Sequence, residues 1–235
     1  MFKRSTHLYD RIYAWKDYPA EAARVHGIVQ RYAPGARTLL DVACGTGKHL
    51  ELLRTWYQVA GTDLDPAMLE IARRRNPDVP LHQADMADLS LGRRFDAVVC
   101  LFSSIGYVRT VERLGQAVAA MGRHVERGGA LLVEPWFTLE EFRPKHVFAL
   151  FVDDPELKIA RVNAHGTVED GRVSVFDFHY LVGTPSAVEH FTERHEMGLF
   201  THDQYLEAFR AAVLEVHHHP QGLEGRGLYV GLRPR

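Results

Sequence analysis

Carboxylates and glycines stand in this chain at spacings that suit a nucleoside-binding site. Asp41 interrupts an apolar run that leads into the glycine turn of residues 43–47, which contains Gly45 and Gly47. Glycine lets the backbone turn sharply and approach a ligand without a Cβ in the way. Asp63 follows this turn by about 20 residues, where nucleotide-binding α/β units carry an acid that accepts hydrogen bonds from the ribose hydroxyls. The residue types therefore predict recognition of a nucleoside.

The glycine turn alone leaves several interpretations open. A plain turn between a strand and a helix in any α/β protein would contain the same residues. The dinucleotide fingerprint needs a third glycine where Leu50 stands. The P-loop needs an earlier glycine, which the preceding strand lacks, and a Ser or Thr where His49 stands. Both of these nucleotide motifs are therefore disfavoured.

The hydrophobic pattern predicts the elements that position these residues. Apolar runs predict strands at 39–42, 58–62, 80–83, 95–101 and 130–133. Helical periodicity predicts helices at 4–16, 19–32, 49–56, 65–75 and 110–125. Alternating strands and helices indicate an α/β fold with a parallel sheet, and such sheets bind ligands at the carboxyl ends of their strands.

The pattern changes to a period of two between residues 138 and 199. Phe176, Phe178 and Tyr180 would share one face of a strand, with Asp177 and His179 on the other. We expect an antiparallel insertion with a hairpin turn at 169–171. A helix at 202–212 and strands at 213–219 and 227–232 would then complete the main sheet. The predicted division is a core of residues 1–137 and 200–235, with an insertion of residues 138–199.

Composition narrows the class of protein. The chain has 235 residues, a net charge of −2 and no persistently basic stretch, which argues against a nucleic-acid partner. Two isolated cysteines favour neither a disulfide framework nor a zinc site. The run His217–His219 is better explained as a strand with exposed histidines, so no metal is expected. No signal peptide or membrane span is apparent, and we expect a cytoplasmic protein.

The word DxACGTG at residues 41–47 resembles motif I of the class I S-adenosylmethionine-dependent methyltransferases. Over nearly the whole chain, the segments LLDVACGTGKHL, LHQADMADLSLGRRF, FSSIGY, EPWF, LFTHDQYLEAF and GRGLYVGL resemble the N-methyltransferases of nucleotide-linked amino sugars. The resemblance implies a Rossmann-like core that ends in an antiparallel hairpin. It also implies that the inserted antiparallel β subdomain, 138–199, covers the active site and offers an interface for a homodimer. The reaction it implies is transfer of one or two methyl groups to a sugar amine.

The resemblance also implies site residues. S-adenosylmethionine would be held by Tyr9, Lys16, Asp41, Ala43, Gly45, Gly47, Asp63, Leu64, Asp85, Met86 and Leu101. In this set Asp63 would bind the ribose and Asp85 the adenine amine. The acceptor would meet Tyr13, Ser104, Glu134, Trp136 and Arg226.

Tyr107 would lie near the acceptor amine and orient it, with His179 and His195 as further candidates for catalysis. One departure from the family bears on the acceptor. Glu224 precedes the GRG turn, and its carboxylate would repel a diphosphate at close range.

Other functions remain open at this point. The acceptor could be another small molecule with a nitrogen or oxygen nucleophile. A nucleic-acid methyltransferase would need a basic face and an Asn/Asp-Pro-Pro-aromatic motif where this chain has FSSI at 102–105. A non-catalytic cofactor-binding module is compatible with the motifs, whereas a nicotinamide dehydrogenase is disfavoured by Leu50.

Overall fold

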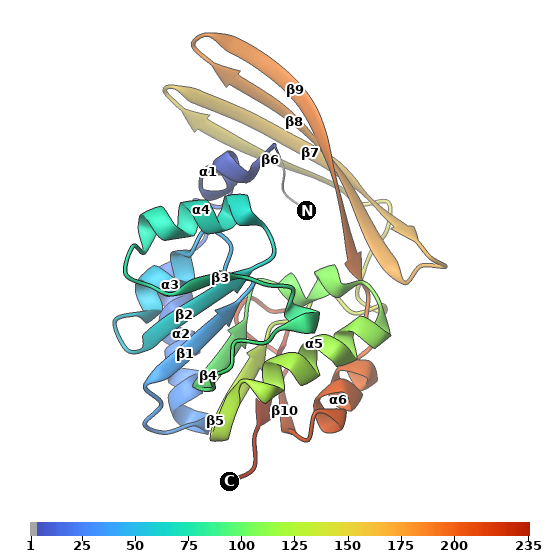
Figure 1. Ribbon diagram of the computed structural model, residues 1–235. Helices are drawn as coiled ribbons and strands as arrows, with labels where there is room; N and C mark the ends of the chain where they lie inside the picture. The colour runs from blue at the N-terminus through green and yellow to red at the C-terminus, as the bar shows by residue number, and fades with distance from the viewer. Residues whose placement is uncertain (1–3) are drawn as a thin grey trace.

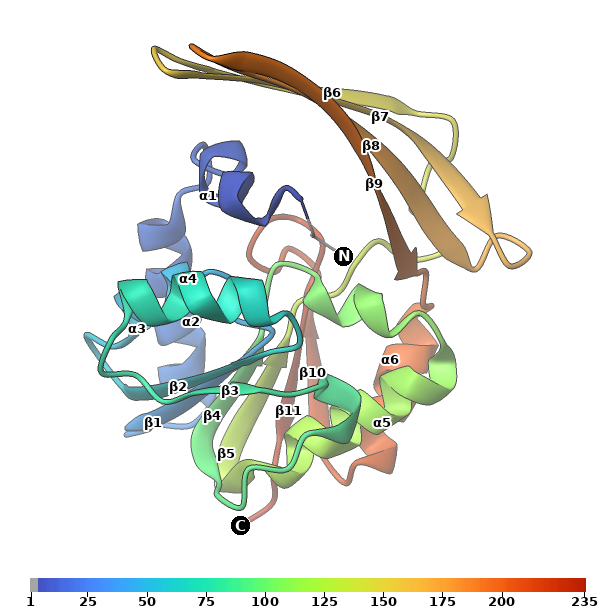
Figure 2. The same cartoon turned by 45° about the horizontal axis from the view of Figure 1, so that its top comes forward.

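The computed structural model describes residues 4–235. Two β-sheets dominate the fold: a seven-stranded sheet with helices on both faces, called sheet A, and a four-stranded antiparallel sheet, called sheet B. Sheet B arches over the end of sheet A, and the N-terminal helix α1 lies beneath the arch (Figures 1 and 2). The expected α/β fold with an antiparallel addition is therefore confirmed.

Sheet A follows the predicted strands closely. Its strands are β1 (Thr38–Val42), β2 (Gln58–Asp63), β3 (Leu81–Gln83), β4 (Phe95–Cys100), β5 (Val125–Val133), β10 (Glu215–His219) and β11 (Leu228–Leu232). Their order is β10-β11-β5-β4-β1-β2-β3, and β11 pairs antiparallel with both β5 and β10. The predicted closing hairpin is thus present, and the order reverses between β1 and β4, where α/β sheets bind their ligands.

Helices cover both faces of sheet A. On one face lie α2 (Tyr18–Tyr32), α3 (Lys48–Leu53) and α4 (Pro66–Arg75); on the other lie α5 (Val111–Arg123) and α6 (His202–Ala211). The burial of strand β4 on both faces explains why its sequence is apolar throughout. Ala97 and Val99 pack with the first helix layer, while Val98 and Cys100 pack with the second. A strand buried on both faces reads as a continuous apolar run.

The helix starts follow local side-chain chemistry. Asp17 caps α2 by accepting from the Ala20 N–H at 3.0 Å, and Asp65 caps α4 by accepting from Ala67 at 2.9 Å. Each cap satisfies a backbone donor that the helix itself leaves unpaired. Because Asp65 supplies the cap of α4, its neighbour Asp63 is available for another role.

Three parts of the chain differ from the expectation. The segment 4–16 forms only a 3₁₀ turn, η1 (Thr6–Leu8), and the four-residue helix α1 (Tyr9–Ile12), because Leu8 and Ile12 are held by packing on sheet B rather than by a long helix. Strand β5 begins earlier than predicted and includes Gly128 and Gly129, at a pairing shift against β4. The sequence did not reveal β6 (Val147–Asp154).

Sheet B contains β6, β7 (Leu157–Val168), β8 (Val173–Thr184) and β9 (Ala187–Gly198) in sequential order. The predicted hairpin turn joins β7 and β8, with positive φ at Glu169, Asp170 and Gly171. The aromatic face of β8 turns toward the core: Phe176 and Tyr180 are buried, whereas Asp177 and His179 are exposed on the outer face. Two further 3₁₀ turns, η2 (Met86–Asp88) and η3 (Ser104–Val108), follow β3 and β4.

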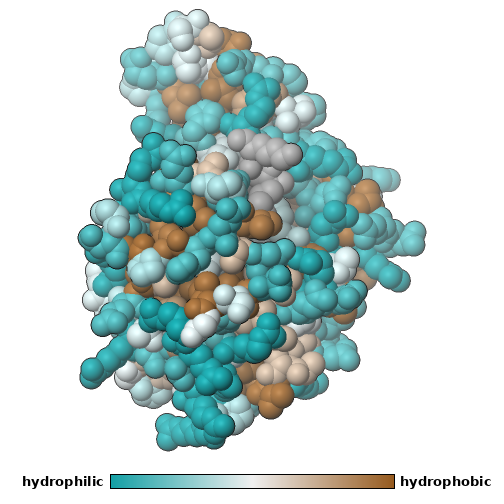
Figure 3. Space-filling model, viewed as in Figure 1, coloured by the Kyte–Doolittle hydropathy of each residue, from teal (hydrophilic) through white to brown (hydrophobic). Residues whose placement is uncertain are grey.

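The molecular surface and the histidine run agree with a polar exterior. Hydrophilic residues cover most of the face in Figure 3, with smaller hydrophobic areas between them. His217 and His219 contact Tyr32, while His218 points the other way, toward His202.

Within residues 4–235 no cluster of metal-ligating side chains is found. No helix of this described part is long and apolar enough to cross a membrane.

Candidate active site

A cavity of about 540 Å³ lies between the carboxyl ends of the sheet A strands and the inner face of sheet B. Its volume is in the range that small-molecule sites occupy. From the core side it is lined by residues of the glycine turn, Asp63, Asp85 and Tyr107. Sheet B contributes Phe148, Arg161, Phe178 and His195, and the N-terminal segment contributes Tyr9 and Tyr13. A cavity of about 30 Å³ adjoins it and is bordered by Asp41, Ala43, Leu101 and Ser104.

The two glycines of the turn have different structural roles. Gly45 has a φ of 56°, and a Cβ there would meet no atom within 4 Å, so its backbone is open to both cavities. Gly47 has a φ of 76°, and a Cβ would come within 2.7 Å of the Asn76 Nδ2 atom. Gly47 lines neither cavity. Its expected contact with the cofactor is therefore corrected: Gly47 lets α3 pack closely on α4.

The two acids of the first strands face the cavities. Asp63 accepts from the backbone N–H groups of Gly45 and Asp65, both at 2.8 Å. Burial raises the pKa of Asp63, and these backbone donors oppose the shift. Asp41 is 2% exposed, and its Oδ2 atom has no hydrogen-bond partner in the described chain. Because buried polar atoms are nearly always paired, this oxygen and the open Gly45 backbone fit a polar ligand in the smaller cavity.

The loop after β3 lies at the rim of the large cavity. Asp85 caps η2 by accepting from the Ala87 N–H at 2.9 Å, and its second oxygen pairs with Arg113 at 2.6 Å. Asp85, Met86 and Leu64 all line the cavity, beside Asp63. This geometry fits the adenosine part of a cofactor, with an acid and an apolar side chain where a base would lie.

Tyr107 and His195 form a buried pair across the cavity. The Tyr107 hydroxyl lies 2.8 Å from Nδ1 of His195, and the Nε2 atom faces the Glu193 carboxylate at 4.0 Å. Burial lowers the pKa of His195 to about 3 and raises that of Tyr107. His179 is instead exposed on the outer face of sheet B, stacked on His190. The catalytic expectation for His179 is thus corrected, because strand alternation turns it away from the cavity.

The N-terminal segment reaches the cavity through its tyrosines. Tyr9 and Tyr13 line it, and Tyr13 packs edge-on against Phe102 with ring centroids 5.1 Å apart. Lys16 was expected to close over the cofactor, but it lines neither cavity. Its ammonium is buried and pairs with Glu21 at 2.6 Å and with Glu224. The expectation for Lys16 is corrected, because two carboxylates hold it behind the site.

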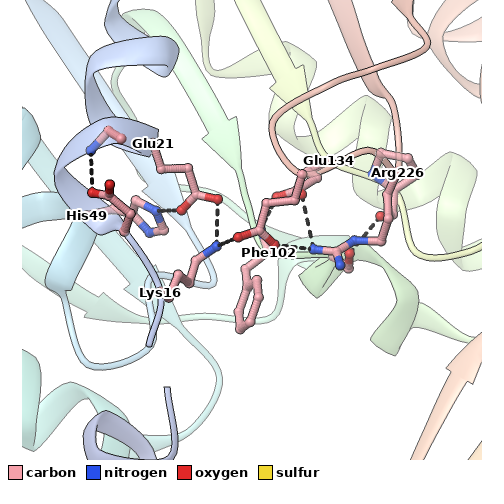
Figure 4. A network of polar contacts seen from close by, with 11 residues as sticks. Lys16, Glu21, His49, Phe102, Glu134 and Arg226 are labelled. Atoms are coloured by element: carbon pink, nitrogen blue, oxygen red, sulfur yellow. Dashed lines mark hydrogen bonds and ion pairs between the residues drawn. The ribbon is translucent and has the colours of Figure 1, made fainter. Parts of the chain in front are cut away.

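A charged network therefore underlies the cavity floor (Figure 4). Glu21 bridges Lys16 and His49, and although burial alone would raise the pKa of Glu21, these two partners lower it. Glu134 is fully buried and accepts from the Phe102 N–H at 2.6 Å and from Arg226 at 3.2 Å. Glu134 was expected to touch the acceptor, but it does not line the cavity. It orients Phe102 and Arg226 instead.

The network also changes the interpretation of Glu224. Its two oxygens pair with Lys16 and with Arg226, the latter at 2.8 Å. A carboxylate held between two cations carries little free negative charge toward the cavity. The predicted repulsion of a diphosphate by Glu224 is therefore wrong.

Other predicted acceptor contacts meet in the large cavity, together with residues that the sequence did not indicate. Tyr13, Ser104, Trp136 and Arg226 all line it. Arg161, Asn163 and His165 line it as well, from the inner face of β7. These three residues stand at every second position of the strand, so the sequence alone indicates that they share one face. Only the packing of sheet B shows that this face is the inner one.

Comparison with known proteins shows the family of this chain. Residues 39–129 match the family described as methyltransferase domain. The chain is 45% identical over 229 residues to the dTDP-3-amino-3,6-dideoxy-alpha-D-glucopyranose N,N-dimethyltransferase of Streptomyces fradiae, covering 96% of this chain and 89% of that protein.

Two solved structures are similar over their whole length. The Streptomyces venezuelae protein DesVI superimposes with a TM-score of 0.93 at 42% identity, covering 99% of this chain and 100% of the other. A SAM-bound amino pentose methyltransferase from Micromonospora echinaspora, involved in calicheamicin biosynthesis, superimposes with a TM-score of 0.88 at 38% identity, covering 99% and 98%. The chain is an S-adenosylmethionine-dependent methyltransferase and belongs to the family of the dTDP-amino-sugar N,N-dimethyltransferases.

Proposed function

We propose that this enzyme methylates the amino group of a nucleotide-linked amino sugar. The observation that carries the proposal is the single cavity that joins Gly45, Asp63 and Asp85 of the core to Tyr107 and the inner face of sheet B. A donor and an acceptor can therefore meet in one cavity. The family relationship supports an amino sugar as the acceptor, since the relatives act on amino hexose or amino pentose substrates.

Several residues would hold the cofactor. Asp63 would accept hydrogen bonds from the ribose hydroxyls, and Asp85 with Met86 would bind the adenine. Asp41, Ala43 and Leu101 would border the methionine end, in the smaller cavity. Tyr9 would cover the cofactor from the N-terminal segment, and Tyr13 would meet the acceptor beside it. Bound S-adenosylmethionine supplies a methyl group that its sulfonium already activates.

Tyr107 would orient the acceptor amine rather than remove its proton. His195 stays neutral because its pKa is about 3. The Glu193 carboxylate, 4.0 Å from Nε2, would favour the tautomer with its proton on Nε2, in which Nδ1 accepts a hydrogen bond from the Tyr107 hydroxyl. The phenol oxygen then offers only lone pairs to the cavity, and it can accept an N–H of the amine. With the N–H bond so directed, the amine lone pair can face the methyl group in line with the bond that breaks.

Sheet B would act as the roof that excludes water. The proposed division is a cofactor-binding core of residues 1–137 and 200–235 with the insertion 138–199 above the acceptor. Phe148, Phe176 and Phe178 bring aromatic surface to the cavity from this insertion. Excluding water strengthens each polar contact inside the site.

The first experiment separates donor from acceptor. Isothermal titration should show binding of S-adenosylhomocysteine, and a mass-spectrometric assay should show transfer of methyl groups to dTDP-3-amino-3,6-dideoxyglucose. No binding by folded protein would end the methyltransferase assignment. Binding without turnover of any amine would favour a non-catalytic module, and salt-sensitive binding of RNA or DNA would favour a nucleic-acid substrate.

Tyr107→Phe tests the orienting role. Turnover should fall by about 10- to 100-fold, as expected for the loss of a hydrogen bond that positions a reactant, with the affinity for S-adenosylhomocysteine unchanged. Tyr32→Phe is a matched control, because Tyr32 also bonds a histidine, His219 at 2.7 Å, but does not line the cavity. Unchanged turnover in Tyr107→Phe would remove this residue from the mechanism.

A homodimer through the outer face of sheet B is part of the proposal. Pairing register and alternation place a group of exposed apolar side chains on that face: Val147, Phe151, Val162, Leu181 and Val188. An exposed apolar patch of this kind marks an association surface, because its side chains can pack against those of a second copy. Light scattering should give a dimer that Phe151→Asp converts to a monomer. A monomeric native protein would refute this assembly.

A further inference from the structure

Arg161 is a buried cation without a carboxylate partner in the described part of the chain. Its side chain belongs to β7, and the residue is 4% exposed. Nη1 donates to the Tyr13 hydroxyl at 3.2 Å, and the guanidinium lies 4.7 Å from the Phe178 ring centroid. No carboxylate oxygen of residues 4–235 lies within 4.0 Å of it. A buried charge that lacks a counter-charge is costly by several kcal/mol, so this arrangement points to a charge supplied by a ligand.

The other arginines of the cavity differ in this respect. Three arginines line it within the described chain. Arg113 pairs with Asp85 at 2.6 Å, and Arg226 pairs with Glu134 and Glu224. Both are already neutralised by the protein. Arg161 is the cavity arginine that keeps an unmatched positive charge.

Asn163, beside Arg161, is a second buried polar side chain with unused hydrogen-bonding capacity. It stands two residues further along β7, on the same face, and is 2% exposed. Neither its Oδ1 nor its Nδ2 atom has a hydrogen-bond partner in the described part of the chain. Because most buried side-chain polar atoms are satisfied, two neighbouring residues with unused capacity mark this part of the roof as a polar subsite.

The subsite lies close to the proposed position of the acceptor amine. Phe178 contacts the Arg161 guanidinium on one side and the His195 ring, at 5.0 Å, on the other. His195 in turn bonds Tyr107. An acceptor whose amine meets Tyr107 would thus carry its remaining groups past this aromatic ring toward Arg161.

We propose that Arg161, with Asn163 beside it, binds the diphosphate of a nucleotide-linked acceptor. The inference rests on the proposed function and identifies the part of the substrate that this corner recognises. A guanidinium offers a planar pair of donors that matches phosphate oxygens. The acids that line the cavity, Asp63, Asp65 and Asp85, come from the core, so the roof is the side that tolerates an anion.

The experiment uses the full chain saturated with S-adenosylhomocysteine. The affinities for dTDP and for thymidine are measured by titration in the native protein, Arg161→Gln and Asn163→Asp. Arg161→Gln removes the charge, while Asn163→Asp sets a carboxylate near Arg161 and should neutralise it. Arg194→Gln is the matched control, because Arg194 belongs to the same sheet but is exposed and pairs with Asp177 and Glu196.

The native protein should bind dTDP more tightly than thymidine, and both cavity variants should lose this preference. Removal of hydrogen bonds to a charged group, at about 1.5–3 kcal/mol, corresponds to an affinity loss of about 10- to 100-fold for dTDP. Thymidine and S-adenosylhomocysteine should bind as before, which also shows that the variants fold. In turnover, KM for the amino sugar should rise more than kcat falls.

Two results would overturn the inference in different ways. If Arg161→Gln retains native affinity for dTDP, the diphosphate binds elsewhere, while the proposed function stands. If the native protein binds S-adenosylhomocysteine but neither binds dTDP nor methylates the dTDP-linked sugar, the proposed acceptor is wrong and the inference falls with it. Should Arg161→Gln fail to fold, native-like dTDP binding by Asn163→Asp would contradict the inference by itself.

Discussion

Replacing Lys16 with methionine should destabilise the fold strongly, although Lys16 lies outside the cavity. The Lys16 ammonium joins Glu21, in α2, to Glu224, which is 208 residues away in the chain. Lys16 and Glu21 have side chains that are 1% and 2% exposed. Methionine retains most of the aliphatic stem but leaves two carboxylates without their shared cation.

The size of the destabilisation depends on the partners that Glu21 and Glu224 retain in the variant. Breaking a buried ion pair by removing one partner costs about 3–5 kcal/mol. Glu21 retains His49 at 2.7 Å, and Glu224 retains Arg226 at 2.8 Å. We therefore expect the lower end of that range, about 3 kcal/mol, which for a chain of this size corresponds to a fall in Tm of about 6–12 °C.

Urea unfolding of the native protein and Lys16→Met measures this difference. Lys158→Met is the control, because Lys158 is an exposed lysine that pairs with Asp153, and such pairs contribute about 1 kcal/mol at most. Adding Glu21→Gln to Lys16→Met should recover part of the loss by removing one stranded charge. A change below about 1 kcal/mol in Lys16→Met would refute the reasoning, since it would place the pair in the range of exposed ion pairs.

The same variant should show a characteristic pH dependence. In the native protein the pKa of Glu21 is lowered from its ordinary value of 4.5, where burial alone would raise it, by His49 and Lys16. The stabilisation by this carboxylate is thus fully present above pH 4.5 and is lost as the pH falls below it. The difference between native protein and Lys16→Met should therefore shrink under acid conditions.

Three further changes have defined outcomes. Asp63→Asn should weaken S-adenosylhomocysteine binding by about 10- to 100-fold in titration, through loss of a charged acceptor, and unchanged affinity would exclude ribose binding by Asp63. Gly47→Ala should lower the free energy of unfolding by more than Gly45→Ala does. Both glycines have a positive φ, but only at Gly47 would a Cβ meet a neighbour, Asn76 at 2.7 Å. Equal losses of unfolding free energy in urea titrations would contradict this. Below pH 6.5 His195 takes up a proton in the unfolded chain, whereas in the folded chain it does so only near pH 3. The free energy of unfolding should therefore fall by about 1.4 kcal/mol for each unit that the pH is lowered between these values. His195→Gln should show a shallower dependence of stability on pH, and an identical dependence would show that His195 titrates normally.

Local sequence features predicted the core of this fold well. The strands of sheet A and the hairpin turn after β7 depend on neighbouring residues, so a single segment contains the information. The expectation for Asp63 and Asp85 used one further rule, that parallel strands bring their carboxyl ends to one edge. Both residues do line the cavity.

The expectations for the insertion succeeded only in part. Alternation in β8 correctly separated His179 from the aromatic residues, but it could not say which face would turn inward. The aromatic face did so because it buries apolar surface against Leu8 and Ile12 of the N-terminal segment. Register then placed His195 opposite Phe176 on that inner face. A histidine in a strand is thus assigned by packing, not by its own sequence.

The sequence by itself determined the glycine turn and the acids at the strand ends, where we propose that the methyl donor binds, because these features follow from local pattern and parallel pairing. Only the tertiary structure decided which side chains meet around and behind the rest of the cavity. It brought Lys16 to Glu224, Tyr107 to His195 and Tyr13 to Arg161, pairs that lie 208, 88 and 148 residues apart. Such contacts depend on strand register and on which apolar faces pack together, and no single segment of the chain records either.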